Sequence, residues 1–340
     1  DACTFANLTI TGTAVKTDNV VFGSNSNQTI TGTLTINGNS PTNRILVSSA
    51  TLAVSRTLTA ATVSVTNADF RDITGAGAGS WDLSAITGGS GDCGGNSGIT
   101  FTTGQTNYWI GGTGNWADVA EWANSSGGSA SSGRVPLPQD DATFDANSFS
   151  AGSQTVTQNM PRAGKNINWT GVTNTPTWTT STAASVFCSL TLVSGMTLTA
   201  STQAYTFEGR GTHTITNAGK TWGKGFDFSA PGGTYTLQDA LISTGSGKIT
   251  INNGTFNSNN FDVSSGGTIS QGTATRGLIM GSSTFTNTDT SGNIWSLTST
   301  GLTFDAGTST IKGTGTGSGT KTFLGGGLTY NNLWFTGTHT

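Results

Sequence analysis

The segment Thr29-Ile30-Thr31-Gly32-Thr33-Leu34-Thr35-Ile36-Asn37-Gly38 decides the fold class of this chain. Apolar Ile and Leu alternate with Thr, so an extended strand places the apolar side chains on one face and Thr on the other. β-Branched Thr suits a pleated surface, whereas Gly and Asn are typical of turns. The pattern recurs at 189–192, 212–216, 248–254 and 302–305. The sequence therefore predicts an all-β fold.

Two all-β architectures compete for this pattern. A sandwich or barrel needs longer strands and a broad core, whereas a β-solenoid needs short strands, small turn residues and a narrow apolar interior. After residue 188 the strand-like units FDF, YTL, ITI, FDV, LIM, FTN, WSL, TFD, TIK and TFL follow one another with little between them. We therefore predict a parallel β-helix (β-solenoid), with Asn252-Asn253 and Asn259-Asn260 at turn corners where left-handed backbone is tolerated.

Composition and charge exclude several kinds of partner. Charged residues make up 9% of the chain and 50 of its 340 residues are Gly, against a usual charged fraction of about 25%. With 14 basic residues and a net charge of −3, the chain lacks the positive charge that nucleic-acid binding requires. No apolar run approaches the roughly 20 residues of a membrane span, so we expect no membrane insertion.

The first residues of the chain are similar to the last ones. Residues 3–13 (CTFANLTITGT) align without gaps on residues 328–338 (LTYNNLWFTGT), at an offset of 325 residues. The match predicts that the chain is one period of a longer tandem array, and a start at Asp1 without Met fits a slice or a processed product. In such an array neighbouring copies meet end to end, and each module caps the open strand edge of the next.

The segment 108–150 differs in composition from the rest of the chain. It contains YWIGGTGNW (108–116), Trp122, a Gly/Ser-rich loop and VPLPQDDATFDANSF (135–149). We interpret it as an aromatic-rich junction or cap whose rings seal a coil. The predicted domains are 1–107, the closing solenoid part of one repeat module; 108–150, the Trp/Pro/Gly-rich junction; and 151–340, the solenoid of the next module.

These motifs, together with NWTGVTNTPT (168–177), resemble the large tandem-repeat modules of bacterial adhesin or autotransporter-like surface proteins and of phage tail-associated proteins. The resemblance covers most of the chain. It implies a parallel β-helix exposed outside the cell or on a virion, with adhesion or scaffolding as its role. We therefore expect a structural repeat module of an extracellular or virion-associated fibre or filament, and not an enzyme.

Asp140, Asp141 and Asp145 form the densest carboxylate group in the sequence. They are the candidates for a Ca²⁺ site, because Ca²⁺ takes six to eight oxygen ligands. No EF-hand or nonapeptide Ca²⁺ loop is present in the sequence. We therefore favour turn capping by these side chains and expect no metal and no cofactor.

Trp109, Trp116 and Trp122 are candidates for either of two kinds of contact. Exposed rings would stack on sugar faces and make the chain a glycan-binding protein, with a cell-surface glycan or another cell-surface receptor as partner. Buried rings would instead seal a module junction, which is the interpretation we favour.

A polysaccharide-degrading β-helix is the catalytic alternative. Asp69, Arg71 and Asp72 come closest to the carboxylate and basic partner that such chemistry needs. Asp69 and Arg71 share a strand face, which also fits a salt bridge on a solvated strand. His213 and His339, the only histidines, fit surface strand positions. We therefore predict no catalytic residue.

Two further expectations concern Thr and Cys. Thr-x-Thr runs such as Thr9/Thr11 make an ice-binding solenoid a remote alternative, although Gly, Asn and Ser interrupt the runs. Cys3, Cys93 and Cys188 are too few and too far apart for a disulfide framework. Three buried thiols are the arrangement we favour, and one bridge with a free thiol is the alternative.

Overall fold

The computed structural model describes residues 1–199, 203–317 and 319–335. It confirms the predicted fold: about 46% of the residues are in strands, about 1% are in helix, and the mostly parallel strands form a β-solenoid of about 14 turns. The chain divides into two compact units. Unit 1 comprises residues 1–111, 116–142 and 160–165, and unit 2 comprises residues 112–115, 143–159 and 166–340. Of the terminal match, residues 336–338 lie outside the described residues.

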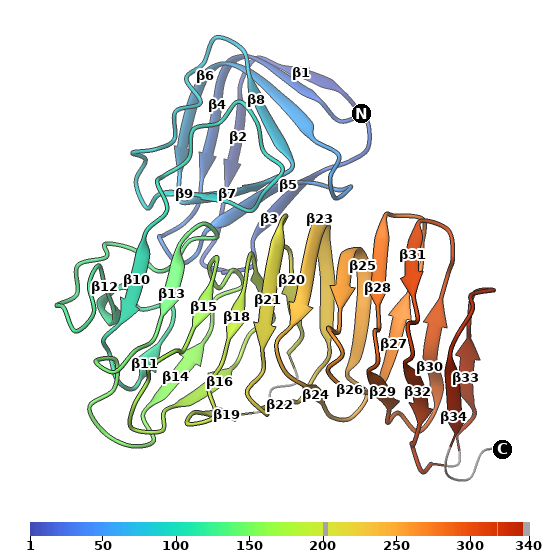
Figure 1. The fold of residues 1–340 in the computed structure, drawn as a ribbon. Coiled ribbons are helices and arrows are strands. Elements are labelled where there is room, and N and C mark those ends of the chain that lie inside the picture. The colour runs from blue at the N-terminus through green and yellow to red at the C-terminus, as the bar shows by residue number, and fades with distance from the viewer. Residues whose placement is uncertain (200–202, 318, 336–340) are drawn as a thin grey trace. The chain divides into compact units, whose positions relative to one another are not determined.

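Unit 1 contains two parallel sheets, which Figure 1 shows in blue. The first sheet follows the order β1-β4-β6-β8, with β2 also paired to β4, and the second follows β3-β5-β7-β9. The strands are β1 (Cys3–Phe5), β2 (Leu8–Thr11), β3 (Asn19–Phe22), β4 (Gln28–Asn37), β5 (Ile45–Ser49), β6 (Arg56–Thr66), β7 (Ala68–Arg71), β8 (Ile73–Ala76) and β9 (Ser90–Asp92). From β3 onward consecutive strands alternate between the two sheets, so each coil stacks on the one before it.

The interior of this part of unit 1 consists of ladders of like side chains. Leu8 is paired with Leu34, and Leu34 with Val63, while Ile10 is paired with Ile36. Leu34 and Ile36 are fully buried. The alternation that predicted the strand in β4 therefore also fixes its register, because a shift by one residue would place Thr in the interior.

Leu34→Ala tests this ladder, because Leu34 has an apolar neighbour in the coil on each side. We expect unit 1 to lose about 2–5 kcal/mol of its free energy of unfolding, since the smaller side chain leaves a cavity that the stacked coils cannot close. Urea denaturation measures the loss. Thr35→Ala, on the outer face of the same strand, is the control and should change stability by no more than about 0.5 kcal/mol; equal losses would contradict the ladder.

Unit 2 contains three parallel ladders of strands. One is β11 (Gly114–Asn115), β14 (Thr155–Gln158), β16 (Thr177–Thr180) and β19 (Thr197–Thr199). The second is β22 (Thr221–Trp222), β24 (Leu241–Ser243), β26 (Val263–Ser265), β29 (Thr284–Asn287), β32 (Thr310–Gly313) and β34 (Asn332–Phe335). The third is β15 (Ile167–Asn168), β18 (Leu190–Thr191), β21 (Thr212–Thr216), β23 (Phe226–Leu237), β25 (Lys248–Asn257), β27 (Gly267–Ser270), β30 (Gly292–Leu297) and β33 (Lys321–Leu324). β17 (Ala184–Val186) and β20 (Tyr205–Phe207) join the third ladder at β23, and β28 (Arg276–Ile279) and β31 (Leu302–Asp305) join it at β25.

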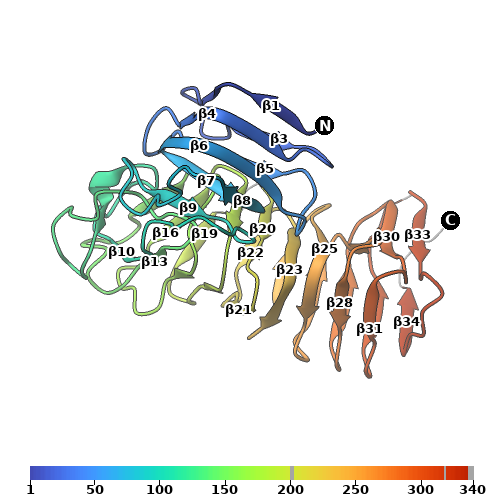
Figure 2. The ribbon, with the colours of Figure 1, turned by 90° about the horizontal axis from the view of Figure 1, so that it is seen from above.

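Successive coils of unit 2 lie directly over one another. Thr155 is paired with Thr177, and Leu241 with Val263, each 22 residues further along the chain. Figure 2 shows β23, β25, β28 and β31 side by side in this order. A coil of this length explains the regular recurrence of strand-like units in the sequence.

The Asn corners were only partly predicted. Asn259 and Asn260 do form a left-handed corner, with φ of 52° and 68°. Asn252 and Asn253 instead lie inside β25, where the register to β23 shifts. The bend there is made by Gly254, with φ of 75°, where a Cβ would come within 2.2 Å of the carbonyl oxygen of Ala230. Glycine takes the conformation that we had assigned to Asn.

Aromatic rings fill the interior of unit 2. Phe228 lies between Phe207 and Phe256, with ring centroids 5.3 and 4.8 Å away, and Phe256 in turn contacts Phe285. All four rings are at most 1% exposed. Each ring comes from a different coil, so the rings connect neighbouring coils through large buried surfaces.

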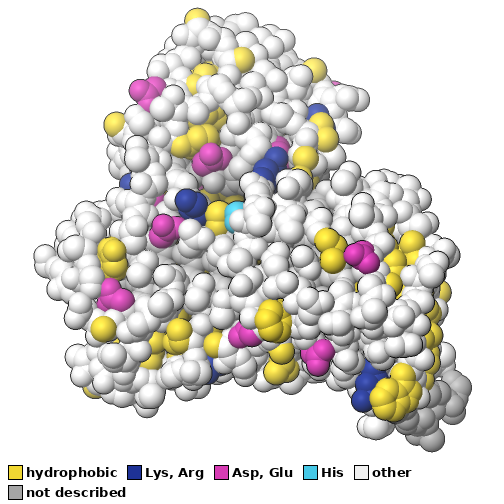
Figure 3. Space-filling view, viewed as in Figure 1, with side chains coloured by type: hydrophobic (Ala, Val, Ile, Leu, Met, Phe, Trp, Pro, Cys, Tyr) yellow, Lys and Arg dark blue, Asp and Glu magenta, His cyan; other side chains and the backbone are white. Residues whose placement is uncertain are grey.

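The surface is correspondingly poor in charge. In Figure 3 most of the visible face is uncharged polar side chain and backbone, with isolated acidic and basic groups. Hydroxyl and amide groups therefore provide most of the hydration, as the composition indicated.

Candidate functional site

Trp109, Trp116 and Trp122 meet in one cluster in unit 1. Trp109 in β10 (Thr106–Trp109) is paired with Trp122 in the antiparallel strand β12 (Trp122–Ala123), which directly follows the short 3-10 helix η1 (Val119–Glu121). The rings of Trp109 and Trp116 lie edge to face on Trp122, with centroids 5.2 and 5.0 Å apart. All three side chains are fully buried. The predicted aromatic-rich element is present, and its rings offer no exposed face to a sugar.

The aspartates of the candidate Ca²⁺ group fall in different surroundings. The buried carboxylate of Asp140 accepts hydrogen bonds from Nε and Nη2 of Arg134, each 2.8 Å long, and from the backbone N–H groups of Gln105 and Leu137. Asp140 belongs to unit 1, whereas Asp145 belongs to unit 2. There Asp145 accepts a hydrogen bond from the backbone N–H of Asn147. These contacts fit turn capping and ion pairing.

The structure places no cluster of three or more His, Cys, Asp or Glu side chains that suits a metal ion among the residues it describes. Asp141 in β13 (Asp141–Thr143) is partly exposed and donates its backbone N–H to the carbonyl oxygen of Gln105. Asp140 and Asp141 are therefore adjacent in sequence but have different contacts.

Asp69 is the centre of a buried ion network in unit 1. Its Oδ1 accepts a hydrogen bond from Nε of Arg44 at 2.8 Å, and its Oδ2 accepts one from Nε of Arg162 at 2.5 Å. Asp69 is 0% exposed, Arg44 1% and Arg162 6%. Arg44 also donates to the carbonyl oxygens of Ala68, Gly88 and Gly89. The solvated position that the sequence suggested for Asp69 is therefore wrong, because the carboxylate points inward to partners from other coils.

Two opposing effects set the pKa of Asp69. Burial alone would raise the pKa of this carboxyl, but the charges and hydrogen bonds of Arg44 and Arg162 outweigh burial and hold it below its ordinary value of 3.8. The ionised carboxylate thus stabilises unit 1 above that pH, and the contribution is lost as the pH falls through the lowered folded-state pKa. Neighbouring Asp72 is also buried and accepts a hydrogen bond from the backbone N–H of Ala53. Neither carboxylate is open to a substrate.

Asp69→Asn should destabilise unit 1 by about 3–5 kcal/mol at neutral pH, because it leaves two buried guanidinium groups without their carboxylate. Hydrogen exchange of the amides in β7 measures the loss. The variant should also lack the part of acid unfolding that develops below pH 3.8. Asp82→Asn, at an exposed aspartate of the same unit, is the control, and an equal effect of the two substitutions would contradict a buried network.

Histidine and cysteine side chains do not assemble with the other candidates. His213 in β21 is partly exposed and lies 5.1 Å from the ring of Tyr235, and His339 lies outside the described residues. None of the three cysteines is in a disulfide. Only Cys93 is buried, whereas Cys188 is partly exposed and Cys3 exposed. The expectation of three buried thiols is wrong because Cys3 lies in β1, at an edge of its sheet.

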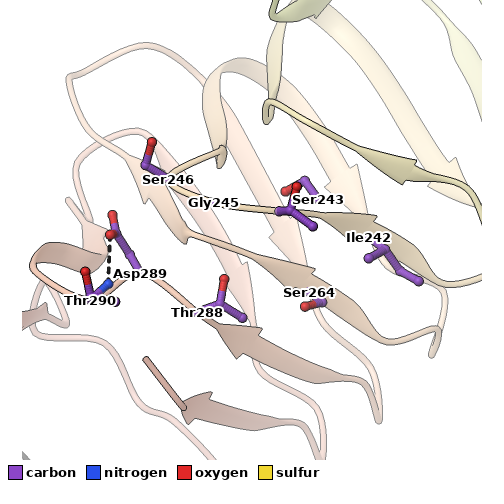
Figure 4. A pocket seen from close by; sticks show the side chains of 9 residues that line it. Ile242, Ser243, Gly245, Ser246, Ser264, Thr288, Asp289 and Thr290 are labelled. Carbon is purple, nitrogen blue, oxygen red and sulfur yellow. Dashed lines mark hydrogen bonds between the residues drawn. The ribbon is translucent and has the colours of Figure 1, made fainter. Parts of the chain in front are cut away.

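An open groove in unit 2 was not anticipated from the sequence. Its volume is about 520 Å³, and turns from three coils line it (Figure 4). The lining is mostly hydroxyl-bearing: Ile242, Ser243, Thr244, Gly245, Ser246, Ser264, Thr288, Asp289 and Thr290. Thr244 and Thr288 are 44 residues apart, which equals two coils of 22 residues. The periodicity of the sequence is therefore the one signal from which the proximity of these turns could have been predicted.

Asp289 supplies the charge in this groove. Its Oδ1 accepts a hydrogen bond from the backbone N–H of Thr290 at 2.8 Å (Figure 4), and its Oδ2 lies 3.8 Å from Nζ of Lys248. The hydroxyls of Thr288 and Ser243 donate to backbone carbonyl oxygens of Ser265 and Gly247. The hydroxyl groups and the carboxylate among the lining residues can act as hydrogen-bond acceptors, and such a lining suits a polyhydroxylated ligand.

The last coil of unit 2 presents an apolar strand edge. Among the described strands β34 is paired with β32 alone, and all four of its residues are exposed. Leu333, Trp334 and Phe335 are 46%, 54% and 38% exposed, and Leu324 in β33 is 45% exposed. Nζ of Lys312 lies 4.4 Å from the centre of the Trp334 ring, a cation–π contact. This edge holds four of the seven large apolar side chains that are exposed among the described residues.

Comparison with known proteins identifies no related protein. No protein-family model, curated protein or solved structure matches the chain. The part of the chain that the structure describes also contains no helix with the length and apolar character needed to cross a lipid bilayer. The fold therefore assigns the chain to the β-solenoid proteins, and its role is argued from its own geometry.

Proposed function

We propose that the chain is a structural repeat module of an extracellular or virion-associated fibre, with adhesion as the function of the assembled fibre. The supporting observation is the ladder Val263, Phe285, Ile311 and Leu333, one residue from each of four successive coils. The first three are at most 1% exposed, whereas Leu333 is 46% exposed. The stack thus gains stability from each added coil and ends on a surface that a further coil would cover.

Burial of one candidate catalytic carboxylate and of one candidate metal ligand also supports a structural role. The carboxylates of Asp69 and Asp140 are held by arginines inside unit 1. The charge-poor surface and the open strand edge suit end-to-end assembly better than the binding and turnover of a small substrate.

Immunogold electron microscopy tests the proposal. Antibodies raised against the purified chain are applied to intact source cells, to their permeabilised counterparts and to virions released from them. We expect gold particles along filaments on intact cells or on virion fibres, because a fibre module is accessible without permeabilisation. Labelling that appears only after permeabilisation would refute an extracellular fibre.

Glycan binding at the Asp289 groove is a second candidate function. The observation that favours it is the cluster of hydroxyl groups around one carboxylate in a groove large enough for one or two sugar rings.

A glycan array probed with the chain and with Asp289→Ala tests the groove. We expect the substitution to weaken binding of the retained glycans at least tenfold, since a hydrogen bond to a charged group contributes about 1.5–3 kcal/mol. Asp305→Ala, at an exposed aspartate elsewhere in unit 2, should bind as the unaltered chain does. Binding that is insensitive to Asp289→Ala, with an unchanged circular dichroism spectrum, would remove the groove as the site.

A further inference from the structure

The backbone of β34 has hydrogen-bonding groups that point away from unit 2. The N–H of Asn332 donates to the carbonyl oxygen of Ser309, beside β32. Residues along a parallel strand alternate in which neighbour they bond, so the N–H group of Leu333 points away from β32. The side chains of Leu333 and Phe335 continue interior ladders, because they are paired with Ile311 and Gly313. Both backbone and side chains of the edge therefore match a further parallel strand.

The sequence of the same edge is similar to that of the first coil of the chain. In the alignment of residues 3–13 with 328–338, Leu333 corresponds to Leu8 and Phe335 to Ile10. In unit 1, Leu8 and Ile10 are also interior residues. The alignment thus matches interior residues of the first coil with interior residues of the last, and it matches the outward-facing Thr9 with the outward-facing Trp334. A chance match between Thr- and Gly-rich segments would have no reason to preserve which side faces inward.

The first coil shows which strand covers such an edge. β4 lies over β2, with Leu34 paired to Leu8 and Ile36 to Ile10. We propose that the open edge of β34 is the seat for the β4 strand of a second copy of this chain, with Leu34 of that copy paired to Leu333 and its Ile36 to Phe335. This inference rests on the proposed fibre function and names the contact that joins its modules. The last coil of one copy then serves as the first coil of the next.

The order of the strands is compatible with this seat. In unit 1, β3 follows β2 and starts the other side of the coil, where it carries β5. In unit 2, β33 precedes β34 and ends its own ladder, so a strand equivalent to β3 has an open neighbour there. Leu324 at the end of β33 is 45% exposed and would be covered by the same added coil.

A fusion tests the seat. Residues 14–165 of a second copy, which include every segment of unit 1 after the first coil, are joined directly after Thr338, the counterpart of Thr13. Hydrogen exchange with residue resolution is then compared between the fusion and the chain alone, at concentrations where sedimentation shows monomers. We expect the amide of Leu333 to exchange at least tenfold more slowly in the fusion, and those of Asn332 and Trp334 to change less, because the latter already face β32.

A matched fusion carries Leu34→Asp and Ile36→Asp in the added copy only. It should leave the amide of Leu333 exchanging as fast as in the chain alone, since the covering strand then places charges on the apolar seat. Unchanged exchange in the fusion without these substitutions would overturn the proposal. This holds whether the added copy folds elsewhere or remains unfolded, because the proposal is that β34 takes the place of the missing β2 and lets the added copy fold on it. Protection of the Leu333 amide already in the monomeric chain would also overturn it. Either result would rule out this contact between copies, but it would not decide the fibre function, which the immunogold microscopy tests separately.

Discussion

The constraint on which this structure depends is that inward-facing residues of one coil lie over inward-facing residues of the next coil. Parallel pairing directs the backbone hydrogen bonds from coil to coil, so no coil satisfies its own backbone. Leu8, Leu34 and Val63 illustrate the consequence for side chains, since Leu34 is fully buried between the partly buried Leu8 and Val63 of the neighbouring coils. Coil length, turn geometry and interior composition all follow from the need to keep this register.

Several of the few charged side chains of this chain lie in its interior, whereas most proteins keep charged side chains at the surface. Arg44 and Arg162 surround Asp69, and Arg134 binds Asp140, in the interior of unit 1. In unit 2, Arg276 is 1% exposed and donates to the carbonyl oxygens of Gly272, Ala274, Thr298 and Thr300 and to Oγ of Ser270. Tight corners leave carbonyl oxygens that no strand neighbour can satisfy, and a guanidinium group with five N–H donors satisfies several at once. Hydration is left to hydroxyls and amides.

Much of the fold was predictable, because the two-residue alternation that identifies β4 or β25 also determines which side chains face inward. The site was less predictable. Asp69 and Arg162 are 93 residues apart, and turns of variable length separate the coils, so their pairing has no periodic signature. Asn253 was misassigned because Gly254 beside it makes the bend. The groove around Asp289 arises only when turns two coils apart are stacked, which local sequence does not show.

Low surface charge and an open apolar edge are a difficult combination for a protein. Exposed strand edges pair readily with other chains, and natural β proteins usually block them with charges, proline or a covering segment. Lys312 lies over Trp334 at an edge that also carries Leu324, Leu333 and Phe335. A parallel coil has two different faces, so a copy that covers this edge leaves an equivalent edge of its own exposed. Such head-to-tail contacts do not close on themselves unless the rotation between copies forms a ring, and the result is a filament.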